Sequence, residues 1–261
     1  MKKATLALQL LLLATALTAC DNNRQAPTLE TPPADTLVQD SPEISEAPEE
    51  PENSEPAVDT SVLLYAEDTL WYEGYLFASQ PIPDAVKARM EGKSMRENPH
   101  IGYDQLRYLT VYHYDYEGQI QKGEIVCNQR IASDLLGVFK ALFIAEYPIC
   151  SIRLIDDFDA DDNASMEANN TSCFNYRVVP GTRALSKHAL GLAIDVNPLQ
   201  NPYISGSQVY PASAAEYVDR TKDFPHKIDE KDYCKKVFTS FGFQWGGYWN
   251  DRDYQHFVKL Q

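Results

Sequence analysis

A run of acidic residues and prolines between positions 21 and 60 limits how much of this chain can fold. It holds eleven acidic residues, one basic residue and seven of the sixteen prolines, and its apolar residues are sparse and not periodic. Such a segment cannot bury enough apolar surface to offset the chain entropy lost on ordering. We therefore expect residues 20–60 to form a disordered, extended linker. Residues 61–261 remain for a single folded domain, because about 200 residues suffice for one sizeable core.

A basic and then apolar segment precedes this linker. Lys2 and Lys3 are followed by a nearly uninterrupted apolar run, residues 4–17, which is too short to span a bilayer. The pattern predicts a secretory signal peptide at residues 1–19. It ends in Leu-Thr-Ala-Cys at Cys20, which resembles the lipobox of bacterial lipoproteins, although an ordinary signal peptide containing a cysteine is the alternative. The resemblance implies lipidation of Cys20, membrane contact through this anchor, and a periplasmic or extracytoplasmic location in the bacterial cell envelope.

Charge and cysteine content bear on the partners of the folded part. The net charge is −15, but the linker and the signal peptide account for about half of it. The remaining mild acidity gives no reason to expect a nucleic-acid partner, and we expect a monomer. Four cysteines follow Cys20, and they could form up to two disulfides in an oxidising compartment or stay as buried thiols. Their spacing is not that of a zinc site. They are Cys127, Cys150, Cys173 and Cys234.

The hydrophobic pattern predicts short strands and helices that do not alternate regularly. Strands are expected at residues 108–116, 123–127, 152–155, 174–179 and 192–196, and near residue 256. Helices are expected at residues 84–90, 134–147 (with Ser133 as the cap), 211–217 and 231–241. Residues 156–171, which are acidic and rich in asparagine, are expected to form a loop. This order favours an α+β fold, a single domain with a central antiparallel sheet flanked by helices.

Two short segments contain the residue types that hold a catalytic zinc ion. His188 and Asp195 lie in the first segment, and Asp253 and His256 lie in the second. Catalytic zinc usually has three ligands drawn from histidine and carboxylate groups, and it lowers the pKa of a water in the open position. A further carboxylate can accept that proton and pass it to a leaving amine. Spacing alone also allows structural histidines and aspartates in turns. The chain has no Gly-rich phosphate loop and no Gly-x-Ser-x-Gly elbow.

The order of these residues resembles a known family. Ser186-x-His188-x-x-Gly191-x-Ala193-x-Asp195, followed by Asp253-x-x-His256-Phe257, is similar to the zinc D-alanyl-D-alanine carboxypeptidase family. That family includes the vancomycin-resistance D,D-peptidases and the L-alanyl-D-glutamate endopeptidases of phage and spore-formers. The resemblance covers roughly residues 100–261, including the segments 169–177, 197–203 and 241–249. It implies the hedgehog/D,D-peptidase-like fold for this zinc peptidase domain.

The resemblance also implies roles for matching residues. His188, Asp195 and His256 would bind zinc, Asp253 would be the general base, and Arg177 would stabilise the developing oxyanion. Many relatives carry glutamate in place of this aspartate.

Other matching residues have two interpretations each. Arg177 could instead form a salt bridge with Asp161 or Asp162. Ser186 is expected to bind substrate or to shape its loop, and Tyr176 is expected to bind substrate. Trp245 and Trp249 could line the cleft or pack in the core.

The expected function is that of a zinc metallopeptidase acting on the stem peptide of peptidoglycan. Two bonds compete: the terminal D-Ala–D-Ala bond, cut by a carboxypeptidase, and the internal L-Ala–D-Glu bond, cut by an endopeptidase. The alternative is a non-catalytic, zinc-containing module that binds cell-wall peptide, and the presence of Asp253 argues against it.

Overall fold

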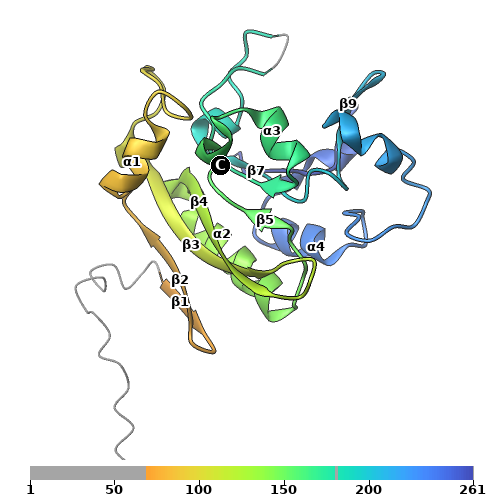
Figure 1. Cartoon of the computed structure of the whole chain (residues 1–261), viewed down its shortest axis with the longest axis horizontal. Helices are drawn as coiled ribbons and strands as arrows, with labels where there is room; N and C mark the ends of the chain where they lie inside the picture. Colours follow the sequence, from red (N-terminus) through yellow and green to blue (C-terminus); the bar gives the residue numbers. More distant parts are fainter. Residues whose placement is uncertain (1–68, 180–181, 261) are drawn as a thin grey trace, which may run out of the picture. The chain divides into compact units, whose positions relative to one another are not determined.

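The computed structural model describes residues 69–179 and 182–260 (Figure 1). The predicted signal peptide, Cys20, the linker and residues 61–68 lie outside the described residues. The chain divides into two units, Met1–Pro56 and Ala57–Gln261, and every described residue belongs to the second. Among these residues, no helix has the length and apolar character needed to cross a membrane.

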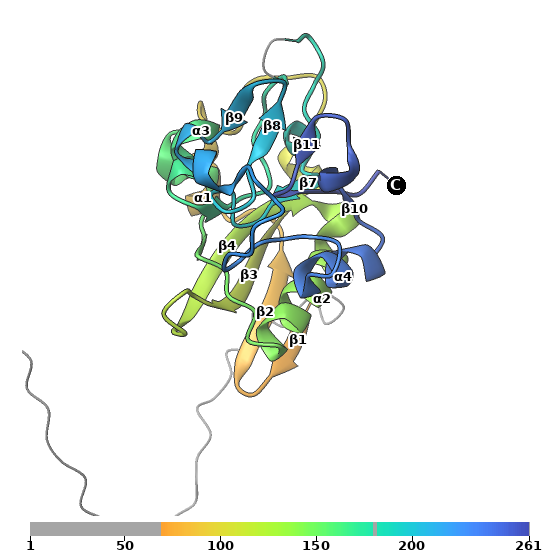
Figure 2. The same cartoon turned by 90° about the vertical axis from the view of Figure 1, so that its right-hand side faces the viewer.

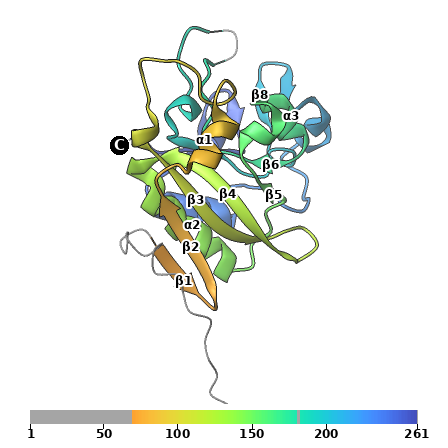
Figure 3. The same cartoon turned by 60° about the vertical axis from the view of Figure 1, so that its left-hand side comes forward.

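A four-stranded antiparallel sheet with the order β1-β2-β3-β4 forms the first half of the described chain (Figures 1 and 3). Its strands are β1 (Thr69–Tyr72), β2 (Tyr75–Gln80), β3 (Leu106–Tyr114) and β4 (Ile120–Asn128). Side chains of β3 alternate between two cores, because successive residues of a strand point to opposite faces. Leu109 and Val111 face the larger core, whereas Leu106 and Tyr108 face a smaller one. The predicted hairpin of β3 and β4 is confirmed.

Helices cover both faces of this sheet. The helix α2 (Gln129–Ile144) packs on the larger core through apolar residues at helical spacing, and α1 (Asp84–Met90) packs on the smaller core. The predicted start of α2 is wrong. Asn128, and not Ser133, is its cap, because Asn128 Oδ1 accepts a hydrogen bond from the Arg130 N–H (3.1 Å). The helix therefore begins directly after the last residue of β4, with no intervening turn.

Three smaller sheets follow (Figure 2). One has the order β10-β12-β7 and contains β10 (Gln244–Trp245), β12 (His256–Val258) and β7 (Ala193–Asp195). Another has the order β11-β8-β9 and contains β11 (Arg252–Asp253), β8 (Tyr203–Ser205) and β9 (Gln208–Tyr210). The third pairs β5 (Ser151–Ile152) with β6 (Asn170–Thr171). A short helix, η3 (Tyr103–Gln105), directly precedes β3. The helices that follow α2 are η4 (Ile155–Phe158), α3 (Asp162–Glu167), η5 (His188–Leu190), η6 (Ala212–Tyr217), α4 (Tyr233–Ser240) and η7 (Gly246–Tyr248).

Two local predictions are wrong. The expected loop at residues 156–171 contains α3, which is capped by the Asp161 side chain. The expected strand at residues 174–179 is absent. The backbone N–H groups of its first three residues bond to three separate segments instead of one neighbouring strand: Phe174 to Val126, Asn175 to His188 and Tyr176 to Ser94. Its last residues form only an isolated bridge, Val178 with Leu185. The broader prediction of an α+β chain with antiparallel sheets is confirmed. All four cysteines of the described part are unpaired.

Candidate metal centre

His188, Asp195 and His256 meet at one point of the structure. Asp195 ends β7 and His256 begins β12, and the two are direct partners in the antiparallel pair, so their side chains share one face. His256 Nδ1 lies 2.8 Å from Asp195 Oδ1. His188 Nε2 lies 3.1 Å from His256 Nδ1 and 3.3 Å from Asp195 Oδ2. Within residues 69–179 and 182–260, this is the one group of three such residues whose donor atoms lie within 4.8 Å of one another.

The position of His188 is fixed from two sides. The Ser186 hydroxyl oxygen accepts a hydrogen bond from the His188 N–H (3.2 Å), which holds the start of η5. The imidazole Nδ1 lies 2.6 Å from the carbonyl oxygen of Cys173. A carbonyl can only accept, so Nδ1 carries a proton, and in the neutral ring Nε2 would present its lone pair to the cluster. A ligand histidine held by a backbone carbonyl is a common arrangement around metal ions.

Gly191 turns the chain from η5 into β7. Its φ is +64°, and a Cβ there would lie 2.6 Å from the backbone nitrogen of Asn128. Its carbonyl oxygen accepts the Asn128 N–H at 2.9 Å. A side chain at this position would meet both backbone strain and a steric clash. The turn therefore seats the ligand-bearing segment directly on the junction between β4 and α2.

Asp253 lies beside the three residues without joining them. Its Oδ2 is 3.9 Å from His256 Nδ1, and its Oδ1 is buried without a hydrogen-bond partner. Burial raises the pKa of Asp253 to about 7. Gly246, in η7, permits this approach, because a Cβ there would lie 2.7 Å from the Asp253 carbonyl oxygen and 3.3 Å from His256 Cβ.

Asp195 and the two histidines shift one another's pKa values. Burial alone would raise the pKa of Asp195, but His188 and His256 hold that pKa well below its usual range. Burial alone would lower the pKa of His188, but the charge of Asp195 raises it above its ordinary value. Two imidazole nitrogens and one carboxylate, with the unpartnered oxygen of Asp253 beside them, match the donor set of a catalytic zinc site. The residues present therefore fit this metal.

Arg177 forms an ion pair with Asp162, the first residue of α3. This is one of the two alternatives that the sequence left open, and Asp161 caps α3 instead. The pair does not remove Arg177 from the site, because its positive charge lowers the pKa values of both His188 and Asp253.

The aromatic candidates separate into two groups. Trp245 is buried, and its Nε1–H donates to the Tyr254 carbonyl oxygen (2.8 Å), so it belongs to the core. Trp249 is 40% exposed, and its ring centroid lies 5.2 Å from that of His256, so it flanks the cluster. Tyr176 is half-buried against the smaller core and stacks near His100 (6.2 Å).

Two contributors to the site were missed in the sequence. The Cys173 carbonyl is a backbone group and leaves no signal in residue types. Tyr203 lies in one of the segments that resemble the family, and it is the cross-strand partner of Asp253. Its position depends on the pairing of β8 with β11, which short strands do not reveal in sequence.

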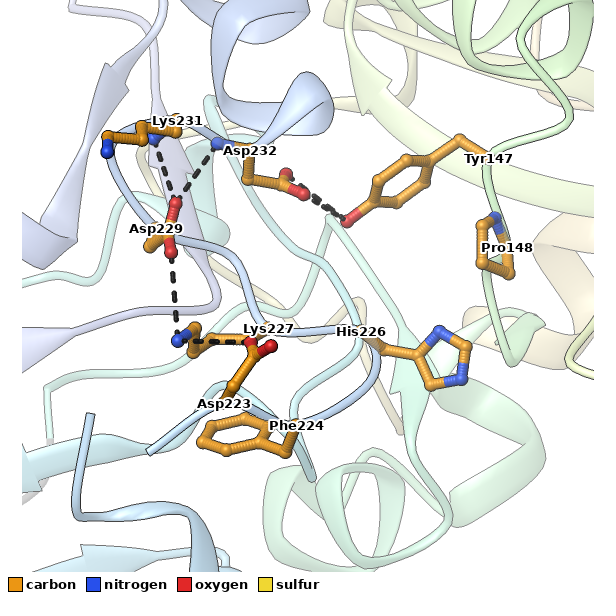
Figure 4. Close-up of a pocket in the computed structure, with 9 residues that line it drawn as sticks. All are labelled: Tyr147, Pro148, Asp223, Phe224, His226, Lys227, Asp229, Lys231 and Asp232. Atoms are coloured by element: carbon orange, nitrogen blue, oxygen red, sulfur yellow. Dashed lines mark hydrogen bonds and ion pairs between the residues drawn. The ribbon is translucent and has the colours of Figure 1, made fainter. Parts of the chain in front are cut away.

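A hollow of about 320 Å³ lies elsewhere, between residues 147–148 and the segment 223–232 (Figure 4). It shares no residue with the cluster. Its charges are mutually compensated: Lys227 Nζ lies 3.7 Å from Asp223 Oδ1 and 3.8 Å from Asp229 Oδ2. The Tyr147 hydroxyl donates to Asp232 Oδ1 (3.2 Å).

Comparison with known proteins bears on the second half of the chain. Residues 180–259 match the family model described as D-alanyl-D-alanine carboxypeptidase. Searches of curated proteins and of solved structures give no significant match. The matched segment contains His188, Asp195, Asp253 and His256, whereas Arg177 precedes it. Residues 180–259 are thus similar to the D-alanyl-D-alanine carboxypeptidase family, as their motifs predict.

Proposed function

We propose that this protein is a zinc metallopeptidase that hydrolyses an amide bond in the stem peptide of peptidoglycan. One observation carries the proposal: three donor atoms lie within 4.8 Å of one another, and a separate carboxylate, that of Asp253, lies beside them with its Oδ2 3.9 Å from His256 Nδ1. A structural zinc site uses four protein ligands, whereas three ligands and a nearby free carboxylate are typical of a hydrolytic site. The family match over the same residues supports this interpretation.

The roles follow from position. His188, Asp195 and His256 would hold the metal, which when bound polarises the scissile carbonyl and lowers the pKa of the attacking water. Asp253 accepts a proton from that water and delivers it to the leaving amine. Its Oδ2 lies 3.9 Å from His256 Nδ1, close enough to exchange a proton with a water at the site.

Arg177 is proposed to stabilise the negative charge that develops on the carbonyl oxygen. A fixed guanidinium near the site costs no reorganisation during the reaction. Its ion pair with Asp162 holds it in place, and its charge already acts on His188 and Asp253.

Ser186 and Tyr176 are the two residues that the family resemblance suggests for substrate binding, and different observations bear on each. The Ser186 hydroxyl is engaged with the His188 N–H, so we propose that Ser186 first shapes the ligand loop. Tyr176 remains a proposed substrate contact. It lies in the irregular segment that precedes Arg177, and its ring is only half-buried.

The location remains a proposal that rests on the N-terminal sequence. A lipid anchor at Cys20 and an extended linker would hold a monomeric peptidase domain near the cell wall, on the periplasmic or extracytoplasmic side. This arrangement gives access to peptidoglycan, which lies outside the cytoplasmic membrane.

Digestion of purified peptidoglycan tests the proposal. Zinc-loaded protein is incubated with peptidoglycan, and fragments are identified by mass. Free D-Ala would indicate a carboxypeptidase, and new D-Glu amino termini would indicate an endopeptidase. Asp253→Ala should keep stoichiometric zinc and lose hydrolysis, whereas His256→Ala should lose both. Unchanged hydrolysis by Asp253→Ala would refute the mechanism. Unchanged fragments with zinc-loaded wild type would favour the alternative, a non-catalytic binding module.

A further inference from the structure

The sheet β11-β8-β9 places two tyrosines in line with the candidate general base. Asp253 pairs with Tyr203, and Tyr203 pairs with Tyr210. Directly paired residues of antiparallel strands project from the same face. The three side chains therefore form one row across the sheet, and Figure 2 shows β8 between β11 and β9.

The tyrosines of this row are not core residues. Both are half-buried, yet neither is packed against the larger or the smaller core. Their rings stack on each other, with centroids 5.8 Å apart and planes 22° apart. The Tyr210 hydroxyl donates to Gln208 Oε1 (2.8 Å), which fixes the outer ring. The pair is thus an ordered aromatic surface that begins beside Asp253.

The chemistry of Asp253 decides which part of a substrate reaches this surface. A base that delivers its proton to the leaving amine must come within about 3 Å of that nitrogen. The residue carrying the leaving amine therefore lies next to Asp253. Paired strands are about 5 Å apart, so Tyr210 lies about 10 Å beyond the base. Extended peptide covers about 3.3 Å per residue, so the row matches about three residues on the leaving side.

We propose that Tyr203 and Tyr210 form a leaving-side subsite that binds two or more peptide residues beyond the scissile bond. The inference rests on the proposed peptidase function and adds the length of the leaving segment. A single leaving residue would contact Tyr203 at most, and Tyr210 would have no role. The row therefore favours cleavage at an internal bond of the stem peptide.

Pairs of synthetic peptides test this inference. For each candidate bond, L-Ala–D-Glu and D-Ala–D-Ala, two peptides share the acyl side and differ in the leaving segment, which has one residue or three. The measured quantity is the ratio of kcat/KM for the long peptide to that for the short one. This ratio is independent of the folded fraction of each preparation, so a partly unfolded variant still gives a valid result.

The zinc-loaded wild type should prefer the longer leaving segment. Tyr210→Ala should lower the ratio about tenfold, since it removes an aromatic contact available only to the longer segment. Tyr203→Ala should lower the ratio less, because a single leaving residue also reaches Tyr203. Tyr203→Phe should retain most of it, because the ring is kept. Tyr233→Ala is the matched control, since Tyr233 is exposed on α4 and lies outside the row.

The outcomes separate the subsite from the proposed function. Hydrolysis with a ratio that neither tyrosine substitution lowers would overturn the subsite and leave the peptidase in place. A wild-type preference for the one-residue leaving segment would do the same. Failure of zinc-loaded wild type to cleave any of the four peptides would remove the proposed function, and the subsite with it.

Discussion

Gly246 gives the sharpest test of how the base is positioned. In Gly246→Ala, the new Cβ would lie 2.7 Å from the Asp253 carbonyl oxygen, 2.9 Å from Asp253 Cβ and 3.3 Å from His256 Cβ. Carbon atoms in contact normally lie about 3.5–4.0 Å apart, so Asp253 or η7 must move by about 0.6 Å or more. Asp253 is held by the pairing of β11 with β8 and His256 by the pairing of β12 with β7, which leaves little room for a harmless shift.

The expected loss of activity follows from this displacement. A misplacement of about 1 Å can cost about 100-fold in rate, so kcat/KM on stem peptide should fall by about 30- to 100-fold, or about 2–2.7 kcal/mol. Overpacking should also lower the free energy of unfolding by about 1–3 kcal/mol. Zinc affinity should fall as well, because the new Cβ would displace His256, one of the proposed ligands. The assays are peptide hydrolysis, zinc titration and thermal unfolding.

Gly137→Ala is the matched control. Gly137 lies inside α2, and a Cβ there would overlap the Phe241 ring, at residues outside the metal centre. Its Tm should change, but its kcat/KM should stay within about twofold of the wild type. A folded Gly246→Ala protein with wild-type kcat/KM and zinc affinity would refute the steric reasoning.

Three further predictions concern stability. Asn128→Ala should lower the free energy of unfolding by about 1 kcal/mol through loss of the α2 cap, whereas Ser133→Ala, at an exposed position within the helix, should be neutral or slightly stabilising; urea unfolding of both would decide between the two caps. Removal of zinc by a chelator should lower Tm, because an ion at 100 times its Kd stabilises the folded state by about 2.7 kcal/mol, and His256→Ala should abolish that shift. In metal-free protein, burial raises the pKa of Asp253 to about 7, above its value in the unfolded chain. The folded state then binds this proton more tightly, so the stability contributed by protonated Asp253 should be lost as pH rises from about 4 through about 7. Asp253→Asn should remove that part of the pH dependence in thermal unfolding, and identical profiles for both proteins would contradict it.

The parts of the fold that the sequence predicted are those with local signals. The apolar spacing of α2 predicted a helix, but not its first turn. Asn128 is both the last residue of β4 and the cap of α2, so no turn residues mark the start of the helix. Residues 174–179 have the composition of a strand, yet the backbone partners of the first three come from three distant segments, and no local pattern encodes that. The grouping of His188, Asp195 and His256 was predicted from residue type and order. The row from Asp253 to Tyr210 depends on pairing between two- and three-residue strands, which only the assembled chain defines.

The register between β7 and β12 has a consequence for how a metal ion would leave the protein. Asp195 and His256 are 61 residues apart in the chain, yet they face each other across this strand pair. An ion held by both would act as a crosslink between the strands, so β12 could not detach from β7 without breaking a coordination bond. We therefore expect metal release and opening of β12 to be one event. Amide hydrogen exchange in β12 should slow when metal binds, by a factor set by the affinity of the ion.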